Sequence, residues 1–206
     1  MTWRAAGCAA ALALAAGLAR ADEPLPPRQQ ALLLLRVLAY DRALRARTGA
    51  DVGVAVVFDE RDPGSAASAA ELVRALEEAA RGYVVSGLPV RVVRCPWRGP
   101  DDLASCLDDR GAAAALVAPG VREPARIARA TRRAEALSAT SSREGVEAGL
   151  SVGLVQRASR AALLVNLPAA RQEGADLDSA LLRVAETLTI GSDPTAASTP
   201  HPAPTP

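Results

Sequence analysis

Two short polar segments hold the residues whose types and spacing could bind a ligand. Asp59, Glu60 and Asp62 place three carboxylates within four positions, a set that could hold Mg²⁺ or Ca²⁺ or could form a solvated turn. The second segment comprises Thr140, Ser141, Ser142 and Gly145. Its hydroxyls and backbone N–H groups could bind an anion at the edge of a sheet, or the segment could be a flexible loop. We favour the solvated turn for the acidic segment and predict neither a metal nor a cofactor.

Two cysteines, Cys95 and Cys106, lie outside the N-terminal apolar stretch. In an oxidising compartment, two cysteines at this spacing usually pair, and closing the loop between them would contribute ~3 kcal/mol to stability. We therefore predict a disulfide, with two unpaired thiols as the alternative.

Several common catalytic sites lack their defining residues in this sequence. The 24 basic side chains are all arginines, and the single histidine is His201, near the C-terminus. A P-loop would lack its lysine, and serine, cysteine or zinc sites built on histidine would lack their imidazole. We therefore predict that the protein is not an enzyme, although carboxylate or serine chemistry stays open.

The first 21 residues have the organisation of a secretory signal peptide. Arg4 precedes an apolar stretch of small residues over 5–18, and Ala19, Arg20 and Ala21 fit the small-x-small cleavage pattern. Because the stretch is shorter than the ~20 residues that span a bilayer, we predict cleavage and export to the periplasm, with an uncleaved anchor as the alternative.

The rest of the chain has a balanced charge and an apolar composition. Loss of Arg4 and Arg20 with the signal peptide would bring the formal net charge from +1 to about −1, and only 2% of the residues are aromatic. Nucleic-acid binding would need a basic face with stacking rings, so we predict none. Residues 191–206 are a Pro/Ser/Thr-rich tail that we expect to be disordered, with His201 an incidental residue rather than a metal ligand.

The region 22–190 is predicted to form one α/β domain. Predicted strands cover 51–58, 88–94, 113–117, 136–140, 150–156 and 161–166, and predicted helices cover 27–47, 66–80 with Ser65 as its cap, 101–109, 124–133, 168–173 and 178–188. Strands and helices alternate as far as residue 140, which indicates a parallel sheet covered on both faces. The last two strands are too close for a helical crossover and predict an antiparallel hairpin. The expected fold is a three-layer α/β/α sandwich whose sheet is mostly parallel.

Asn166, the only asparagine, ends the last predicted strand. Its amide could cap the helix that begins near Pro168, which is the interpretation we favour, or it could contact a ligand.

In the C-terminal third, Asn166 ends a predicted strand, Ala169 and Ala170 follow, and Gly174 precedes a Leu-Leu-x-x-Ala sequence at 181–185. This segment resembles the closing segment of the periplasmic YfiR/HmsC-like family. In that family a strand ending in Asn leads to an Ala-Ala pair, a Gly and a Leu-Leu-x-x-Ala helix. The corresponding residues here are Asn166, Ala169, Ala170, Gly174, Leu181, Leu182 and Ala185, and upstream Gly145, Gly149 and Gly153 match the entry to the family's hairpin. The resemblance extends over about 28–190.

The resemblance implies a non-enzymatic periplasmic regulator, typically a homodimer. Members of the family restrain an inner-membrane diguanylate cyclase, the enzyme of cyclic-di-GMP signalling, through its periplasmic sensor domain. It also makes a redox switch at Cys95 and Cys106 a further alternative to a structural disulfide.

Two hypotheses of function follow. The first is a regulator that contacts the periplasmic domain of an inner-membrane signalling protein. We expect that interface near the first helix, at Tyr40, and at Trp97, whose proline and arginine neighbours predict an exposed ring of the kind that anchors protein contacts. Trp97 could instead cover the end of the sheet. The second hypothesis is a small-molecule binding protein that feeds a transporter or sensor, with the loop around Thr140 as its site.

Overall fold

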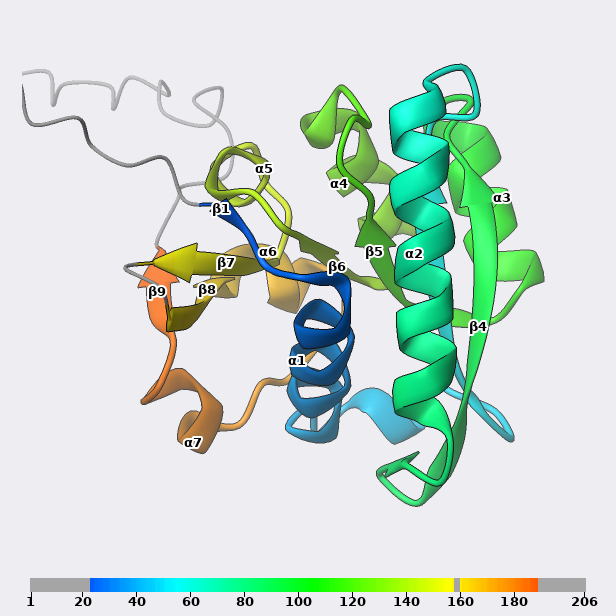
Figure 1. Ribbon diagram of the computed structural model, residues 1–206. Coiled ribbons are helices and arrows are strands. Elements are labelled where there is room, and N and C mark those ends of the chain that lie inside the picture. The colour runs from blue at the N-terminus through cyan, green and yellow to red at the C-terminus, as the bar shows by residue number, and fades with distance from the viewer. Residues whose placement is uncertain (1–22, 158–159, 189–206) are drawn as a thin grey trace, which may run out of the picture.

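The computed structural model describes residues 23–157 and 160–188 (Figure 1). The predicted signal peptide, 1–21, and the predicted tail, 191–206, lie outside the described residues. Over the described residues, no helix combines the length and apolarity needed to cross a membrane.

One nine-stranded sheet organises the chain. Its strands are β1 (Glu23–Pro24), β2 (Val52–Phe58), β3 (Val84–Val85), β4 (Leu88–Pro96), β5 (Ala112–Val117), β6 (Leu137–Thr140), β7 (Val152–Arg157), β8 (Arg160–Asn166) and β9 (Glu186–Leu188). They lie in the order β3-β4-β2-β5-β6-β7-β8-β9, and β1 pairs with β7 beyond the end of β6. From β4 to β7 the neighbours are parallel, whereas β7 and β8 form the predicted antiparallel hairpin.

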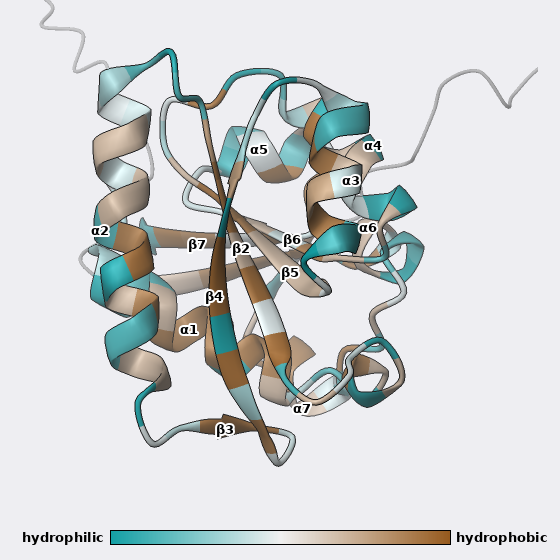
Figure 2. Cartoon of the chain, turned by 90° about the vertical axis from the view of Figure 1, so that its right-hand side faces the viewer, coloured by the Kyte–Doolittle hydropathy of each residue, from teal (hydrophilic) through white to brown (hydrophobic). Residues whose placement is uncertain are grey.

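Helices cover both faces of this sheet and give it three layers. The longer ones are α1 (Pro27–Ala39), α2 (Pro63–Ala80), α3 (Pro100–Asp109) and α4 (Pro124–Arg133), and the shorter ones are η1 (Leu44–Ala46), α5 (Arg143–Glu147), α6 (Leu167–Gln172) and α7 (Ser179–Leu182). Figure 2 shows α1 and α2 on one side of the sheet and α3, α4 and α6 on the other. The predicted α/β fold with a mostly parallel sheet is confirmed.

The composition of the strands explains the two-sided burial. Every residue of β2 and β5 is buried, because each face of these central strands meets a layer of helices. Val54 and Val56 pack towards α1 and α2, whereas Ala55 and Val57 pack towards α3 and α4. In Figure 2 the ribbon of β2 is mostly brown, whereas β4 alternates brown with teal segments.

The first helix is shorter than predicted. It ends at Ala39 rather than Arg47, and a turn and the 3₁₀ helix η1 follow. The carboxylate of Asp41 explains the change of direction, because it accepts hydrogen bonds from the backbone N–H groups of Ala43 and Asp176. These bonds hold the chain in a turn where helix periodicity alone would continue the helix.

Two other element boundaries differ from the prediction. Asp62, not Ser65, caps α2, and the Ser65 hydroxyl instead accepts a hydrogen bond from the N–H of Asp59. The predicted helix 178–188 ends at Leu182, and β9 follows, parallel to β8. Residues 186–188 form a strand because they pair with the otherwise free edge of β8. The sequence pattern of 178–188 alone does not reveal this pairing.

Candidate ligand pocket

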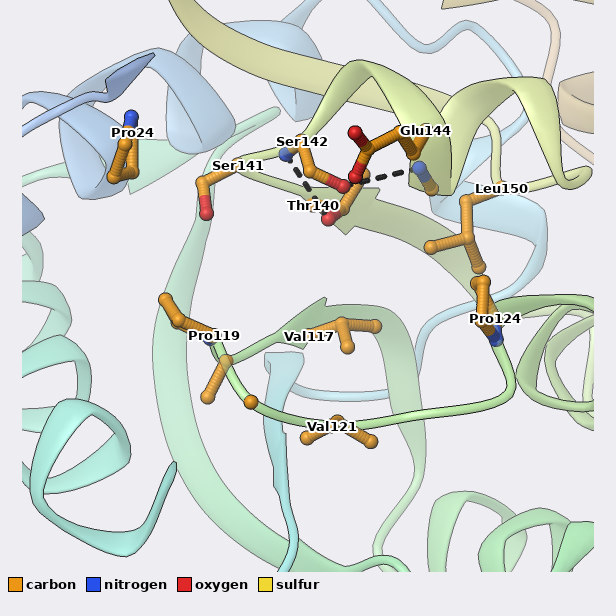
Figure 3. Close-up of a pocket in the computed structure, with 13 residues that line it drawn as sticks. Pro24, Val117, Pro119, Val121, Pro124, Thr140, Ser141, Ser142, Glu144 and Leu150 are labelled. Carbon is orange, nitrogen blue, oxygen red and sulfur yellow. Dashed lines mark hydrogen bonds between the residues drawn. The ribbon is translucent and has the colours of Figure 1, made fainter. Parts of the chain in front are cut away.

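The carboxyl ends of the parallel strands meet at one edge of the sheet and form a pocket there. Its volume is about 370 Å³, and the segments that follow β5 and β6 supply its two walls (Figure 3). The lining residues are Pro24, Val117, Ala118, Pro119, Gly120, Val121, Pro124, Thr140, Ser141, Ser142, Glu144, Gly145 and Leu150. In open α/β sheets this edge is the usual location of ligand sites.

One wall of the pocket is apolar. Val117 ends β5, Pro119 and Val121 follow in the next turn, and Pro124 begins α4. Leu150 adds an apolar side chain from the segment before β7 (Figure 3). Val117 and Leu150 are buried members of the core between the sheet and α3 and α4. This wall is therefore held by the same packing that holds the fold.

The other wall is the polar segment identified in the sequence. The N–H of Ser142 donates to the hydroxyl of Thr140 at 3.3 Å, and the N–H of Gly145 donates to the hydroxyl of Ser142 at 3.0 Å. A Cβ at Gly145 would lie only 2.9 Å from the methyl carbon of Thr140, so glycine permits this close approach. All four predicted loop residues, including Ser141, line the pocket. The segment folds into α5 with Ser142 as its cap, which the sequence analysis did not predict.

Ser141 differs from its neighbours because its hydroxyl has no protein partner. The residue is 6% exposed, yet within residues 23–157 and 160–188 its side chain makes no hydrogen bond. Figure 3 shows the hydroxyl pointing towards the opposite wall, at Pro119. The residue as a whole is buried, but its hydroxyl oxygen stays accessible from the pocket, where water or a ligand can bond to it.

The pocket has an acidic rim. Glu144 is the single ionisable side chain among the lining residues, and it is exposed on the first turn of α5. The neighbouring Arg143 is directed to Glu186 on β9, with 3.0 Å between its guanidinium nitrogen and the carboxylate. The charge at the rim is therefore negative.

The acidic turn after β2 is fully engaged by other residues. Asp59 pairs with Arg61, whose hydrogen bonds hold the pKa of the Asp59 carboxyl below its ordinary value. Glu60 pairs with Arg98 at 2.9 Å, and Asp62 accepts from the N–H of Gly64 at the start of α2. In the described part of the chain no cluster of acidic, histidine or cysteine side chains could hold a metal ion.

Cys95 and Cys106 are joined by a disulfide in the structure, with 2.02 Å between the sulfurs. The bond ties β4 to α3.

The prediction of an exposed ring at Trp97 is wrong. Trp97 is 3% exposed and packs in the core between the sheet and α3 and α4, with the Arg126 guanidinium 5.9 Å from its ring centre. Its N–H donates to the carbonyl of Phe58, so the residue extends the pairing of β4 with β2 and its side chain turns inwards. Tyr40, by contrast, is 40% exposed at the end of α1, and its role in partner contact stays a prediction.

Asn166 has the capping position that the sequence favoured. Its side-chain oxygen accepts from the N–H of Ala169 in α6, and its amide donates to the carbonyl of Val146. Both ends of the side chain are engaged within the protein. Asn166 is also absent from the pocket lining.

Sequence reasoning missed one buried carboxyl, Glu173. Its oxygens accept hydrogen bonds from the hydroxyls of Thr131 and Ser151 and from the N–H of Ser138. Burial raises the pKa of Glu173 above its ordinary value. The residue lies near the amino ends of β6 and β7, away from the pocket, and no local signal distinguishes it from a surface glutamate that ends a short helix.

Solved structures of two bacterial proteins share this fold. A conserved domain protein from Vibrio cholerae O1 biovar El Tor strain N16961 matches with a TM-score of 0.53 and 16% identity, over 79% of this chain and 60% of that one. The ABC domain in complex with L-Trp from Streptococcus pneumonia matches with a TM-score of 0.50 and 14% identity, over 79% of this chain and 62% of that one. The chain thus spans about three fifths of each structure.

Comparison of sequences identifies the family. No curated protein matches the chain. The family model described as YfiR/HmsC-like matches residues 65–186, more than half of the chain and most of the described fold. This range contains both walls of the pocket, the disulfide and the hairpin. The chain therefore belongs to the YfiR/HmsC-like family of periplasmic regulators.

Proposed function

We propose that this protein is a periplasmic, non-enzymatic regulator that binds the periplasmic domain of an inner-membrane signalling protein and holds it in one state. The observation that carries the proposal is the family match over residues 65–186. In the family the regulated protein is a diguanylate cyclase, so the proposed output is a change in cyclic-di-GMP.

Exposed apolar side chains on α1 support a protein contact there. Leu32 in α1 is 50% exposed and Tyr40, directly after the helix, is 40% exposed, although the other apolar residues of α1 are mostly buried in the core. Aromatic side chains on a surface are frequent anchors of protein interfaces. We therefore place the partner contact at α1, without Trp97.

Co-purification of membrane proteins from the native host tests this proposal. Tagged protein should retrieve a membrane protein with a periplasmic domain, and Tyr40→Ala should reduce the yield without changing the melting temperature. Val184→Ala is the matched control, because Val184 is 78% exposed and lies outside α1. Deletion of the gene should also change the cyclic-di-GMP level. Retrieval of no membrane protein and an unchanged cyclic-di-GMP level would contradict the proposal.

The second candidate function is binding of a small molecule for a transporter or sensor. Two observations favour it: the pocket with the unpartnered hydroxyl of Ser141, and the fold shared with a domain whose structure holds L-Trp. A small molecule that raises the melting temperature and shifts the NMR signals of lining residues would support this candidate. A neighbouring gene for a permease favours it as well, whereas one for a membrane cyclase favours the regulator.

A further inference from the structure

The volume of the pocket and its apolar wall suit a compact apolar group. Its volume of about 370 Å³ lies at the lower end of the usual range for small-molecule sites. Val117, Val121 and Leu150 offer no hydrogen-bonding side-chain atoms, and Val117 and Leu150 are fixed in the core. An apolar group placed against this wall would leave water without needing any polar partner.

The opposite wall requires a hydrogen-bonding group on the ligand. Ser141 is a buried residue whose hydroxyl opens into the pocket and has no partner in the part of the chain that the structure describes (Figure 3). A ligand that covers this hydroxyl displaces the water it can bond to, so the ligand must replace that hydrogen bond or bear the cost of losing it. A purely apolar ligand would bear that cost, so a ligand with a polar group at this wall is favoured.

The charge around the pocket selects the kind of polar group. Glu144 contributes a carboxylate to the lining, whereas no arginine lines the pocket and Arg143 is directed to Glu186. Two backbone N–H groups that could have bound an anion, those of Ser142 and Gly145, already donate to hydroxyls within the segment. An anion would therefore meet a negative rim and few free donors, whereas a cation would be attracted.

We propose that this pocket binds a small primary amine with a compact apolar body, a proposal that rests on the second candidate function above. The ammonium group lies at the polar wall, where it can bond to the Ser141 hydroxyl and pair with the Glu144 carboxylate. The apolar body packs against Val117, Val121 and Leu150. This assigns a positively charged ligand to the segment 140–145, in place of the anion that its hydroxyls suggested.

Three probes of one shape and different charge test the proposal. They are 3-methylbutylamine, 3-methylbutanoate and 3-methylbutan-1-ol, titrated calorimetrically into the mature protein at neutral pH. We expect the amine to bind about tenfold more tightly than the other two. Glu144→Gln should weaken the amine about fivefold, the scale of an exposed charge pair, and leave the alcohol unchanged. Ser141→Ala should weaken both the amine and the alcohol.

Glu147→Gln is the matched control, since it removes the same charge from the same helix, α5, outside the pocket lining. If it weakens the amine as much as Glu144→Gln does, the proposed pairing is wrong. If the carboxylate or the alcohol binds as tightly as the amine, the ligand class is wrong but the pocket remains a binding site. If none of the three binds at millimolar concentration, both the amine and the second candidate function fail, and the regulator is tested by co-purification alone.

Discussion

Polar groups at the two edges of the sheet differ in whether they have hydrogen-bond partners within the protein. At the amino edge, Arg47 donates to the backbone carbonyls of Ala113 and Glu135 and pairs with the buried carboxylate of Asp41. At the carboxyl edge, Ser141 is a buried residue whose hydroxyl opens into a pocket and has no partner in the described chain. Polar groups at the first edge hold the segments of the fold together, whereas the second edge keeps one hydroxyl available.

Glu173 belongs to the same pattern as Asp41. It connects α4, β6 and the start of β7 through three donors, and Ser138 itself accepts from the N–H of Ser151 at 2.9 Å. Two buried guanidinium nitrogens at the amino edge, Arg47 Nε and Arg132 Nε, lack a partner, although other nitrogens of both side chains donate hydrogen bonds. The comparison teaches that partnered buried groups indicate structure, and an unpartnered one beside a cavity indicates a place for a ligand.

Breaking the amino edge should have the largest effect. Asp41→Ala leaves the Arg47 guanidinium buried without its counter-charge and two backbone N–H groups without an acceptor. We expect a loss of about 3–5 kcal/mol in the free energy of unfolding, measured by guanidinium denaturation. The control is Arg42→Ala, which removes an exposed pair with Asp178 and should cost less than about 1 kcal/mol. Equal losses in the two variants would refute the special role of the buried pair.

Removing the disulfide should have the next largest effect. It ties β4 to α3, and without it the unfolded chain gains the freedom of the loop between Cys95 and Cys106. The double variant Cys95→Ala, Cys106→Ala should lose about 3 kcal/mol of stability. Addition of reductant to the wild-type protein should lower its denaturation midpoint, and the same addition to the double variant should not. An unchanged midpoint in reduced wild-type protein would contradict the prediction.

Patterns within short segments predicted much of this fold. The apolar run 51–58 and the alternation of strands and helices were enough to predict a mostly parallel sheet with a terminal hairpin. The polar wall of the pocket could be predicted for the same reason, since Thr140 ends a strand and Ser141 and Ser142 directly follow it. The apolar wall at Val117 and Val121 was not predicted as part of a site, because only the parallel pairing of β5 with β6 brings the two segments together.

The failures come from contacts between distant segments. Trp97 has neighbours typical of an exposed turn, but pairing with β2 turns its ring into the core. Helix periodicity predicted 178–188, whereas 186–188 supply a partner for β8. Glu173 looks like any glutamate at the end of a helix until Thr131 and Ser138 are placed beside it by the fold.

The pH dependence of stability should reveal the raised pKa of the buried Glu173 carboxyl. Because burial raises the pKa of its carboxyl above 4.5, the folded chain retains this proton at pH values where the unfolded chain has lost it. The contribution of Glu173 is therefore complete below about pH 4.5 and is lost as the pH rises through the folded-state pKa. The stability of Glu173→Gln relative to wild type should increase over this interval, measured by urea denaturation at successive pH values. A difference that stays constant with pH would contradict this.

Two serines, Ser138 at the start of β6 and Ser141 directly after its end, allow the sharpest test of the comparison and involve the smallest expected change in stability. The Ser138 hydroxyl accepts a hydrogen bond from the buried N–H of Ser151. Ser138→Ala leaves that N–H without an acceptor and should lower the free energy of unfolding by about 1–3 kcal/mol. The Ser141 hydroxyl has no partner in the described chain, so Ser141→Ala removes no protein hydrogen bond and should change stability by less than about 0.5 kcal/mol.

Differential scanning calorimetry of both variants, with and without 3-methylbutylamine, separates the two roles. Ser138→Ala should melt earlier and still be stabilised by the amine, whereas Ser141→Ala should melt like wild type and gain less from it. If Ser141→Ala instead lowers the melting temperature as much as Ser138→Ala does, Ser141 is a structural residue, and the carboxyl edge differs from the amino edge only in shape.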